Sequence, residues 1–191
     1  MSAPAHSEVT AATPLRVTVD PVHGRGTVAF FDGTATIAGC TAQPIDAAGN
    51  ASCSAAFAQP GAHAVHAAYA GIDDWLPSTS PATTVFVSAP TVLDVRAATV
   101  LPVKHTVQLS ARLTTKSGAS SVAGRTITFA SLDNAYLCRA KTNADGVATC
   151  EIGAKDAPGP LAKGYAGRFA GDGLYDPSQG TAPSTLSATS S

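Results

Sequence analysis

Apolar and polar side chains alternate along most of this chain with a period of two. Residues 27–30 read Thr-Val-Ala-Phe and residues 64–69 read Ala-Val-His-Ala-Ala-Tyr, while positions 165, 167 and 169 hold Tyr, Gly and Phe. Such alternation is typical of a strand that buries one face, whereas an amphipathic helix repeats every 3.6 residues. No window of the sequence shows a convincing helical repeat, so the pattern predicts an all-β protein.

Turn signals such as DAAGN, QPG, NADG and GDG separate the alternating stretches every 8 to 15 residues. Many short strands at this spacing are typical of a β-sandwich. In the first half we predict strands at 7–12, 14–20, 26–31, 34–40, 50–57, 62–69 and 82–88. In the second half we predict strands at 92–99, 105–114, 125–131, 135–141, 147–153, 161–169 and 181–187. Seven strands in each half match the count of an immunoglobulin-type sandwich.

The two halves are related by an internal repeat. The stretch YAGIDDWLPS, which begins at Tyr69, aligns without a gap with FAGDGLYDPS, which begins at Phe169, so that Trp75 corresponds to Tyr175. GRGTVAFFDG likewise matches AGRTITFASL, and DAAGNASC matches NADGVATC. The same series of motifs therefore occurs twice in the same order.

A repeat spacing of about 100 residues predicts two domains of ordinary size. We place them at 1–89 and 90–191. The junction VSAPTV is short and contains Pro90, which limits its conformational freedom. It predicts a semi-rigid joint that keeps the two domains end to end.

The repeated motifs carry a family resemblance. In the first half they comprise Gly26, Val28, Phe30, Gly49, Asn50, Tyr69, Gly71, Trp75 and Ser78. In the second half they comprise Ile127, Phe129, Asp145, Gly146, Phe169, Gly171, Asp172, Tyr175 and Ser178. With these residues both halves resemble bacterial immunoglobulin-like (Big-type) repeat domains, the modules of large secreted and surface proteins. The resemblance implies two tandem immunoglobulin-like β-sandwiches.

One position departs from the family pattern. The acidic residue that follows glycine in the closing motif is Asp172 in the second half, but Ile72 stands there in the first half. Asp73 or Asp74 is the candidate to replace it. This mismatch argues against a metal site shared by both halves.

The closing motif makes physical sense as a packing device. A strand ends at the first aromatic residue, the glycine lets the chain turn, and Trp75 or Tyr175 can fold back over the open end of the sandwich. The alternative is that Trp75 and Tyr175 are exposed platforms that stack on sugar rings. Both readings name the same two side chains.

Four cysteines fall two in each half, with separations of 13 and 12 residues. A turn lies midway in each interval, so each pair is expected to face across a hairpin and form a disulfide, Cys40–Cys53 and Cys138–Cys150. Free buried thiols are the alternative, while a zinc site needs four ligands and each half has only two cysteines. Persistent disulfides indicate an oxidising compartment. The chain is therefore expected to be secreted or at the cell surface, with its signal peptide absent from the sequence as printed.

Composition narrows the classes of partner. Charged residues make up 13% of the chain and the formal net charge is −1, which argues against nucleic acid and against an anionic membrane surface. Polar positions are filled mainly by small uncharged residues, which predicts a surface with little electrostatic specificity. No run of 18 apolar residues is present, so no membrane insertion is expected.

No catalytic constellation stands out, so we expect no enzyme and no cofactor. His63 and His66 are the only neighbouring histidines, and side chains three positions apart on a strand point to opposite faces. Acidic residues lie mostly in turns, where Asp has a local hydrogen-bonding role. The sequence does not decide whether these Asp-rich loops form a weak calcium site, although no metal requirement is expected.

The leading hypothesis is a non-enzymatic structural or adhesive spacer in a secreted or cell-surface bacterial protein. The alternative is a carbohydrate- or cell-wall-binding accessory module of a secreted enzyme or phage-like particle. Candidate partners are a cell-wall polymer, a glycan or other domains of the parent chain. The protein itself is expected to be a monomer.

Overall fold

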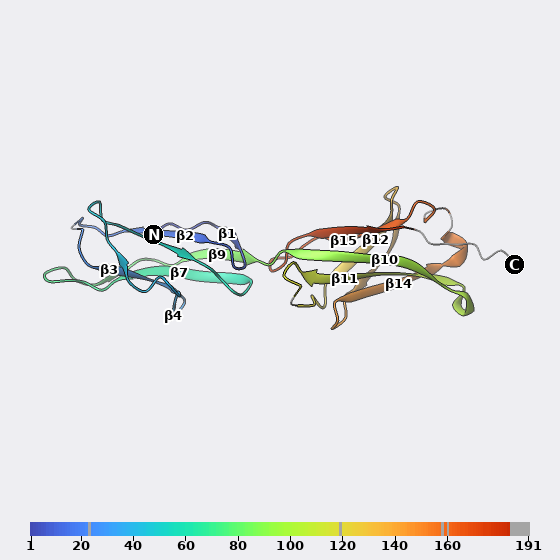
Figure 1. Ribbon diagram of the computed structural model, residues 1–191, viewed down its shortest axis with the longest axis horizontal. Coiled ribbons are helices and arrows are strands. Elements are labelled where there is room, and N and C mark those ends of the chain that lie inside the picture. The colour runs from blue at the N-terminus through green and yellow to red at the C-terminus, as the bar shows by residue number, and fades with distance from the viewer. Residues whose placement is uncertain (23, 119, 158, 160, 184–191) are drawn as a thin grey trace. The chain divides into compact units, whose positions relative to one another are not determined.

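The computed structural model describes residues 1–22, 24–118, 120–157, 159 and 161–183 (Figure 1). The chain divides into two compact units, Met1–Ala89 and Pro90–Ser191. The described residues form strands and turns, with two three-residue 3₁₀ turns as the helical structure among them. The predicted all-β class is confirmed.

Unit 1 is built from two sheets. The larger has the strand order β1-β9-β7-β3-β4, with β5 also paired to β3 and β8 to β7, and the smaller pairs β2 with β6. The strands are β1 (His6–Glu8), β2 (Thr13–Thr18), β3 (Thr27–Asp32), β4 (Ala35–Thr36), β5 (Gln43–Pro44), β6 (Asn50–Ala55), β7 (Gly61–Tyr69), β8 (Ser78–Thr79) and β9 (Thr83–Ser88).

The core of unit 1 lies between these sheets. Leu15 from the smaller sheet packs in one cluster with Phe30, Val65 and Val85 from the larger sheet, and all four are fully buried. Each occupies an apolar position of the alternating pattern, because successive strand residues face opposite sides. The alternation with a period of two in the sequence thus corresponds to side chains that face the core and the solvent in turn.

Unit 2 repeats the two-sheet arrangement. One sheet has the order β10-β11-β14 and the other β13-β12-β15-β16. The elements are β10 (Thr91–Leu101), η1 (Pro102–Lys104), β11 (Thr106–Thr115), β12 (Thr126–Ser131), β13 (Tyr136–Lys141), β14 (Val147–Gly153), η2 (Ala154–Asp156), β15 (Tyr165–Phe169) and β16 (Ser178–Ala182). Leu109, Ile127 and Phe129 are fully buried where the two sheets face each other.

Several predicted strands differ from the structure in their bounds. The segment predicted at 34–40 is strand only at β4, because the chain then turns at Gly39, whose φ is +77°. The strand predicted at 161–169 begins only at Tyr165, because the Gly164 N–H donates to the Leu161 carbonyl oxygen in a turn and the Leu161 side chain is buried there. The strand predicted at 181–187 appears as β16, and residues 184–187 lie outside the described residues.

The first strand also differs between the units. In unit 2, β10 pairs antiparallel with β11 along most of its length. In unit 1, Ser2 exchanges two backbone hydrogen bonds with Arg16 of β2, after which β1 pairs in parallel with β9 of the other sheet. The strand predicted at 7–12 ends at Glu8, and Thr10 beyond it has a φ of +62°.

A buried tyrosine hydroxyl closes a gap in the β10–β11 ladder. The register shifts between Arg96 and Thr99, which leaves backbone groups beside the bulge without their ladder partners. The Tyr165 hydroxyl donates to the Arg96 carbonyl oxygen and accepts from the Ser110 N–H at 3.2 Å. Tyr165 is fully buried, and this burial raises the pKa of its hydroxyl.

Tyr165→Phe should destabilise unit 2 while leaving its fold unchanged. The substitution keeps the ring but leaves the Arg96 carbonyl and the Ser110 N–H unsatisfied, which costs about 1–3 kcal/mol. Chemical denaturation gives the free energy of unfolding. Tyr136→Phe removes a hydroxyl from a side chain that is 65% exposed and serves as the control, with an expected change near zero. Equal effects of the two substitutions would contradict this role.

Candidate functional site

The closing loop of unit 1 runs from the end of β7 to β8. Gly71 begins it with a φ of +80°, and a Cβ there would lie 2.7 Å from the Trp75 carbonyl oxygen. Ile72 and Trp75 exchange backbone hydrogen bonds of 3.0 and 2.9 Å. The glycine is thus required both by its backbone conformation and by the close return of the chain.

The closing loop of unit 2 has the same form with one addition. Gly171 has a φ of +81°, and the Asp172 N–H donates to the Tyr175 carbonyl oxygen at 2.9 Å. The Asp172 carboxylate also accepts from the N–H groups of Leu174 and Tyr175, at 2.8 and 2.9 Å. The loop therefore holds its own tip together without a ligand.

Trp75 and Tyr175 occupy equivalent places in the two loops. Each side chain is half-buried and packs against the core of its own unit. The guanidinium carbon of Arg125 lies 4.8 Å from the centre of the Tyr175 ring, so a cation covers part of that ring. Both side chains are thus attached to the cores of their own units, and part of the Tyr175 ring is covered by Arg125.

An ion pair ties each closing loop to the start of the neighbouring core strand. Arg25 Nη1 lies 3.3 Å from Asp73 Oδ2 in unit 1, and Arg125 Nε lies 2.9 Å from Asp172 Oδ2 in unit 2. Asp73 is the acidic residue that replaces the one missing at Ile72. In the sequence alignment Arg25 stands one position before the counterpart of Arg125, and Asp73 one position after the counterpart of Asp172, which is why the repeat alone did not reveal the pair.

The ionisation of Asp172 follows from these contacts. Partial burial alone would raise the pKa of its carboxyl, but the hydrogen bonds from Leu174, Tyr175 and Arg125 outweigh that effect and lower the pKa. The carboxylate is therefore charged at neutral pH and acts as a structural acceptor within the loop.

The disulfides join the residues that the spacing predicted, but not across a hairpin ladder. Cys40 bonds to Cys53 and Cys138 to Cys150, and none of the cysteines is free. In unit 2, Cys138 lies on β13 of one sheet and Cys150 on β14 of the other. The hairpin interpretation is wrong because β13 and β14 flank one turn yet belong to different sheets.

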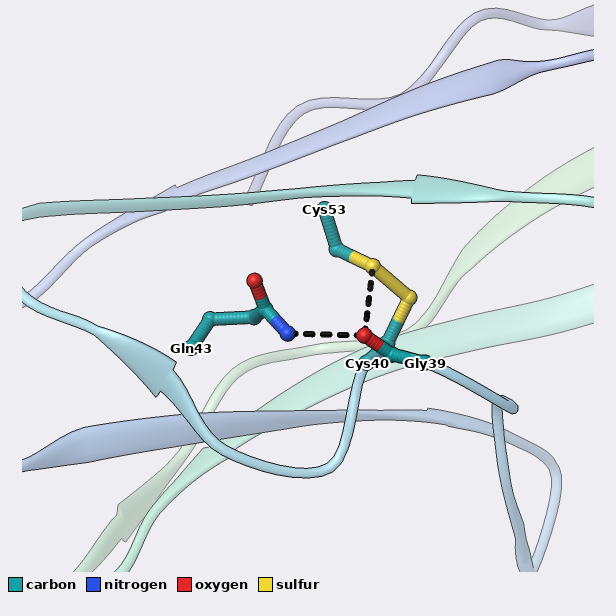
Figure 2. The surroundings of a disulfide bond; sticks show 4 residues. All are labelled: Gly39, Cys40, Gln43 and Cys53. Atoms are coloured by element: carbon teal, nitrogen blue, oxygen red, sulfur yellow. Dashed lines mark hydrogen bonds between the residues drawn. A yellow bond between two sulfur atoms is a disulfide. The ribbon is translucent and has the colours of Figure 1, made fainter.

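The unit 1 disulfide also connects the two sheets. The Cys40 carbonyl accepts from Phe30 N–H of β3, while Cys53 lies on β6, which pairs with β2. Figure 2 shows the two segments that this disulfide joins, where the Gln43 side-chain amide donates to the Gly39 carbonyl oxygen at 2.8 Å. Each bond thus fastens one edge of its sandwich.

His63 forms a polar cluster that was not predicted from the sequence. Its Nδ1 lies 2.5 Å from Asp32 Oδ2, its Nε2 lies 3.0 Å from the Gln59 carbonyl oxygen, and its ring packs on Phe57. Burial alone would lower the pKa of His63, but the hydrogen bonds with Asp32 and Gln59 and the charge of Asp32 raise it overall. His66 faces the other side of β7 and stacks on Phe31, so the predicted opposition of the two histidines is observed.

The described residues offer no metal centre of the usual kind. No group of three or more His, Cys, Asp or Glu side chains converges among them. No described helix is long and apolar enough to cross a membrane. Each ion pair among the described residues joins two segments of one unit.

Comparison with known proteins identifies unit 1. Residues 1–88 match the family model described as bacterial Ig-like domain (group 3), so the first unit belongs to that family. The predicted resemblance is thus confirmed there, and unit 2 carries the same motifs in the same order. No curated protein sequence matches the chain.

Several solved structures are similar over most of this chain. The adhesin InvE of Yersinia pseudotuberculosis is 16% identical, with a TM-score of 0.42, over 96% of this chain and 57% of that one. The D0-D1 domain of intimin is 16% identical, with a TM-score of 0.36, over 95% of this chain and 96% of that one. The tetra-tandem repeat in the extending region of a large adhesion protein is 16% identical, with a TM-score of 0.45, over 91% of this chain and 45% of that one. The chain therefore spans little more than half of InvE and less than half of the tandem repeat.

Each disulfide should stabilise its own unit alone. Replacing Cys138 and Cys150 by Ser releases a short loop in the unfolded state and should destabilise unit 2 by about 3 kcal/mol, without moving the unfolding of unit 1. Replacing Cys40 and Cys53 by Ser should destabilise unit 1 without moving the unfolding of unit 2. Hydrogen exchange resolved by segment measures the two units separately. A disulfide between the units in non-reducing peptide mapping would contradict this expectation.

The His63–Asp32 pair should make stability depend on pH. Because the folded-state pKa of His63 is raised, its contribution is fully present below the unfolded value of about 6.5 and is lost as pH rises through the folded value. The difference in unfolding free energy between wild type and His63→Gln should therefore shrink from pH 5.5 to pH 9 in a series of denaturant titrations. His66→Gln is the control, because the described structure gives His66 no carboxylate partner. A difference that stays constant across this range would exclude the charged pair.

Proposed function

We propose that the two units form a non-enzymatic spacer, a structural or adhesive segment of a secreted or cell-surface bacterial protein. The observation that carries this proposal is that each unit is closed by its own contacts. Each has its own core, its own disulfide between the sheets and its own aromatic side chain packed against that core. A module closed in this way can be repeated along a chain without needing a ligand to complete it.

The disulfides also support the location. Such bonds persist in oxidising compartments and are rare in the cytosol. Because each bond fastens one sheet to the other, it also limits how far the unit can extend when its ends are pulled. Both properties suit a segment outside the cell that bears mechanical load.

The joint between the units supports a spacer in a different way. Only Ala89 and Pro90 separate β9 from β10. The Pro90 ring fixes its own φ and restricts the preceding residue to extended conformations. A two-residue connection of this kind is short and stiff compared with a Gly/Ser-rich linker.

The spacer predicts a narrow distribution of distances between the units. Spin labels placed on one exposed strand position of each unit and measured by pulsed electron resonance report this distribution directly. A six-residue Gly-Ser insertion between Ala89 and Pro90 is the matched control and should broaden the distribution markedly. Equal widths for the two proteins would contradict the stiff joint.

The rival function is an accessory module that binds carbohydrate through its aromatic side chains. A screen against neutral glycans and cell-wall polymers tests it with the intact chain. The spacer predicts no saturable binding that depends on Trp75 or Tyr175. Binding that disappears in Trp75→Ala or Tyr175→Ala, with the fold retained by circular dichroism, would replace the spacer with the binding module.

A further inference from the structure

The net charge of −1 conceals opposite charges on the two units. Residues 1–89 contain two basic and six acidic residues, a net charge of −4. Residues 90–191 contain ten basic and seven acidic residues, a net charge of +3. Whole-chain composition therefore hides an excess of cations in unit 2, and the expected lack of electrostatic character does not hold there.

Part of this excess lies on the outward face of the sheet β13-β12-β15-β16. In that sheet Phe129 pairs with Cys138 and Gly167, and these residues face the core. The next register pairs therefore face outward.

One outward row crosses all four strands. Arg139 of β13 pairs with Thr128 of β12, Thr128 pairs with Arg168 of β15, and Arg168 pairs with Gln179 of β16. Arg139, Arg168 and Gln179 are exposed and Thr128 is half-buried. A guanidinium, a hydroxyl, a second guanidinium and a carboxamide thus follow one another across the sheet.

Adjacent positions extend this polar face. Lys141 pairs with Thr126 on one side of the row, and Tyr136 pairs with Ala130 on the other. The Tyr136 side chain is 65% exposed. A shallow hollow of about 700 Å³ lies over β12, β15 and β16, with Thr126, Thr128, Arg168 and Gln179 in its wall.

The cations of this face have no carboxylate to neutralise them among the described residues. Arg168 Nη2 donates to the Asn134 side-chain oxygen at 2.8 Å, a neutral acceptor that orients the guanidinium and leaves its charge uncompensated. Arg139 and Lys141 take part in no ion pair of the described structure. Nearby carboxylates are engaged elsewhere, since Asp133 pairs with Lys163 and Asp172 with Arg125, both at 2.9 Å.

We propose that this face binds an acidic polysaccharide in which anionic and neutral units alternate. Neighbouring strands lie about 4.8 Å apart, so Arg139 and Arg168 stand roughly 10 Å apart with the hydroxyl of Thr128 between them. A linear polymer lying across the strands meets a cation at every second strand, with neutral hydrogen-bonding groups in between. Guanidinium groups bind carboxylate and sulfate oxygens in a bidentate manner.

Other anionic partners fit the face less well. Three cations on a flat sheet and a unit charge of +3 are a small footprint for a nucleic acid. The hydroxyl and amide groups of Thr126, Thr128 and Gln179 match sugar hydroxyls, and the exposed Tyr136 ring can pack against a sugar face. This binding role is separate from the spacer role, because the face excludes Trp75 and Tyr175 and lies within unit 2.

Calorimetric titration of the intact chain tests the proposal. The probes are hyaluronan, which carries a carboxylate on alternate sugars, chondroitin sulfate, which adds a sulfate, and dextran, which is neutral. We expect saturable binding to one or both acidic polymers, and we expect added salt to weaken it. We expect no binding to dextran. Equal affinities for the two acidic polymers would assign the binding to the carboxylate that they share, and a higher affinity for chondroitin sulfate would show that the added sulfate contributes.

The Arg139→Gln/Arg168→Gln variant should bind the acidic polymer at least about tenfold more weakly, because two charge-assisted contacts are lost. The Lys116→Gln/Lys155→Gln variant removes the same charge from a turn and from η2, and it should bind nearly as well as wild type. Thermal melts confirm that both variants fold.

Three outcomes would overturn the proposal. The first is the absence of binding to both acidic polysaccharides, and the second is an equal loss in the two double variants, which would indicate attraction to net charge alone. The third is binding of poly(glycerol phosphate) or duplex DNA that matches or exceeds the polysaccharides. The spin-label experiment on the connection between the units tests the spacer and does not depend on polysaccharide binding. Either proposal can therefore be wrong while the other holds.

Discussion

The structure depends on the requirement that each unit close an apolar core within a short chain. Domains of about 100 residues bury a modest fraction of their surface, so the two sheets must cover each other completely and their ends must be sealed. The Trp75 and Tyr175 side chains pack against the cores of their own units. The disulfides act at the edges, where strands of different sheets come together and few backbone hydrogen bonds cross. Inside unit 2, the Tyr165 hydroxyl forms hydrogen bonds with the Arg96 carbonyl oxygen and the Ser110 N–H beside the bulge.

The two units reach the same geometry with different residues. The closing loops of both are held to a core strand by an Arg–Asp pair, although each partner has moved by one position between the repeats. Such a shift is tolerated because a loop and the end of a strand allow small displacements along the chain, whereas the core positions beside them do not. The Arg–Asp contact is therefore common to both units, although the sequence alignment of the two repeats does not place its residues at matching positions.

The units differ most on their outward faces. Solvent-facing positions of a strand are free of packing constraints, so the charges there can diverge while the cores stay alike. Unit 1 carries a net negative charge, and unit 2 gathers three cations on one sheet. This divergence gives two modules of similar construction different surfaces.

The class of the fold, the strands with clear alternation and the partners of the cysteines could be predicted from the sequence. These features depend on short-range patterns, because a period of two and the spacing from a turn are visible in a single stretch of chain. The sequence could not determine which strands share a sheet, so Cys138 and Cys150 were assigned to one hairpin when they lie on different sheets. Nor could it reveal contacts such as Arg125 with Asp172, His63 with Asp32 or the row from Arg139 to Gln179, whose members are distant in sequence. Those were decided by the tertiary structure, because the register of several strands at once sets which side chains meet.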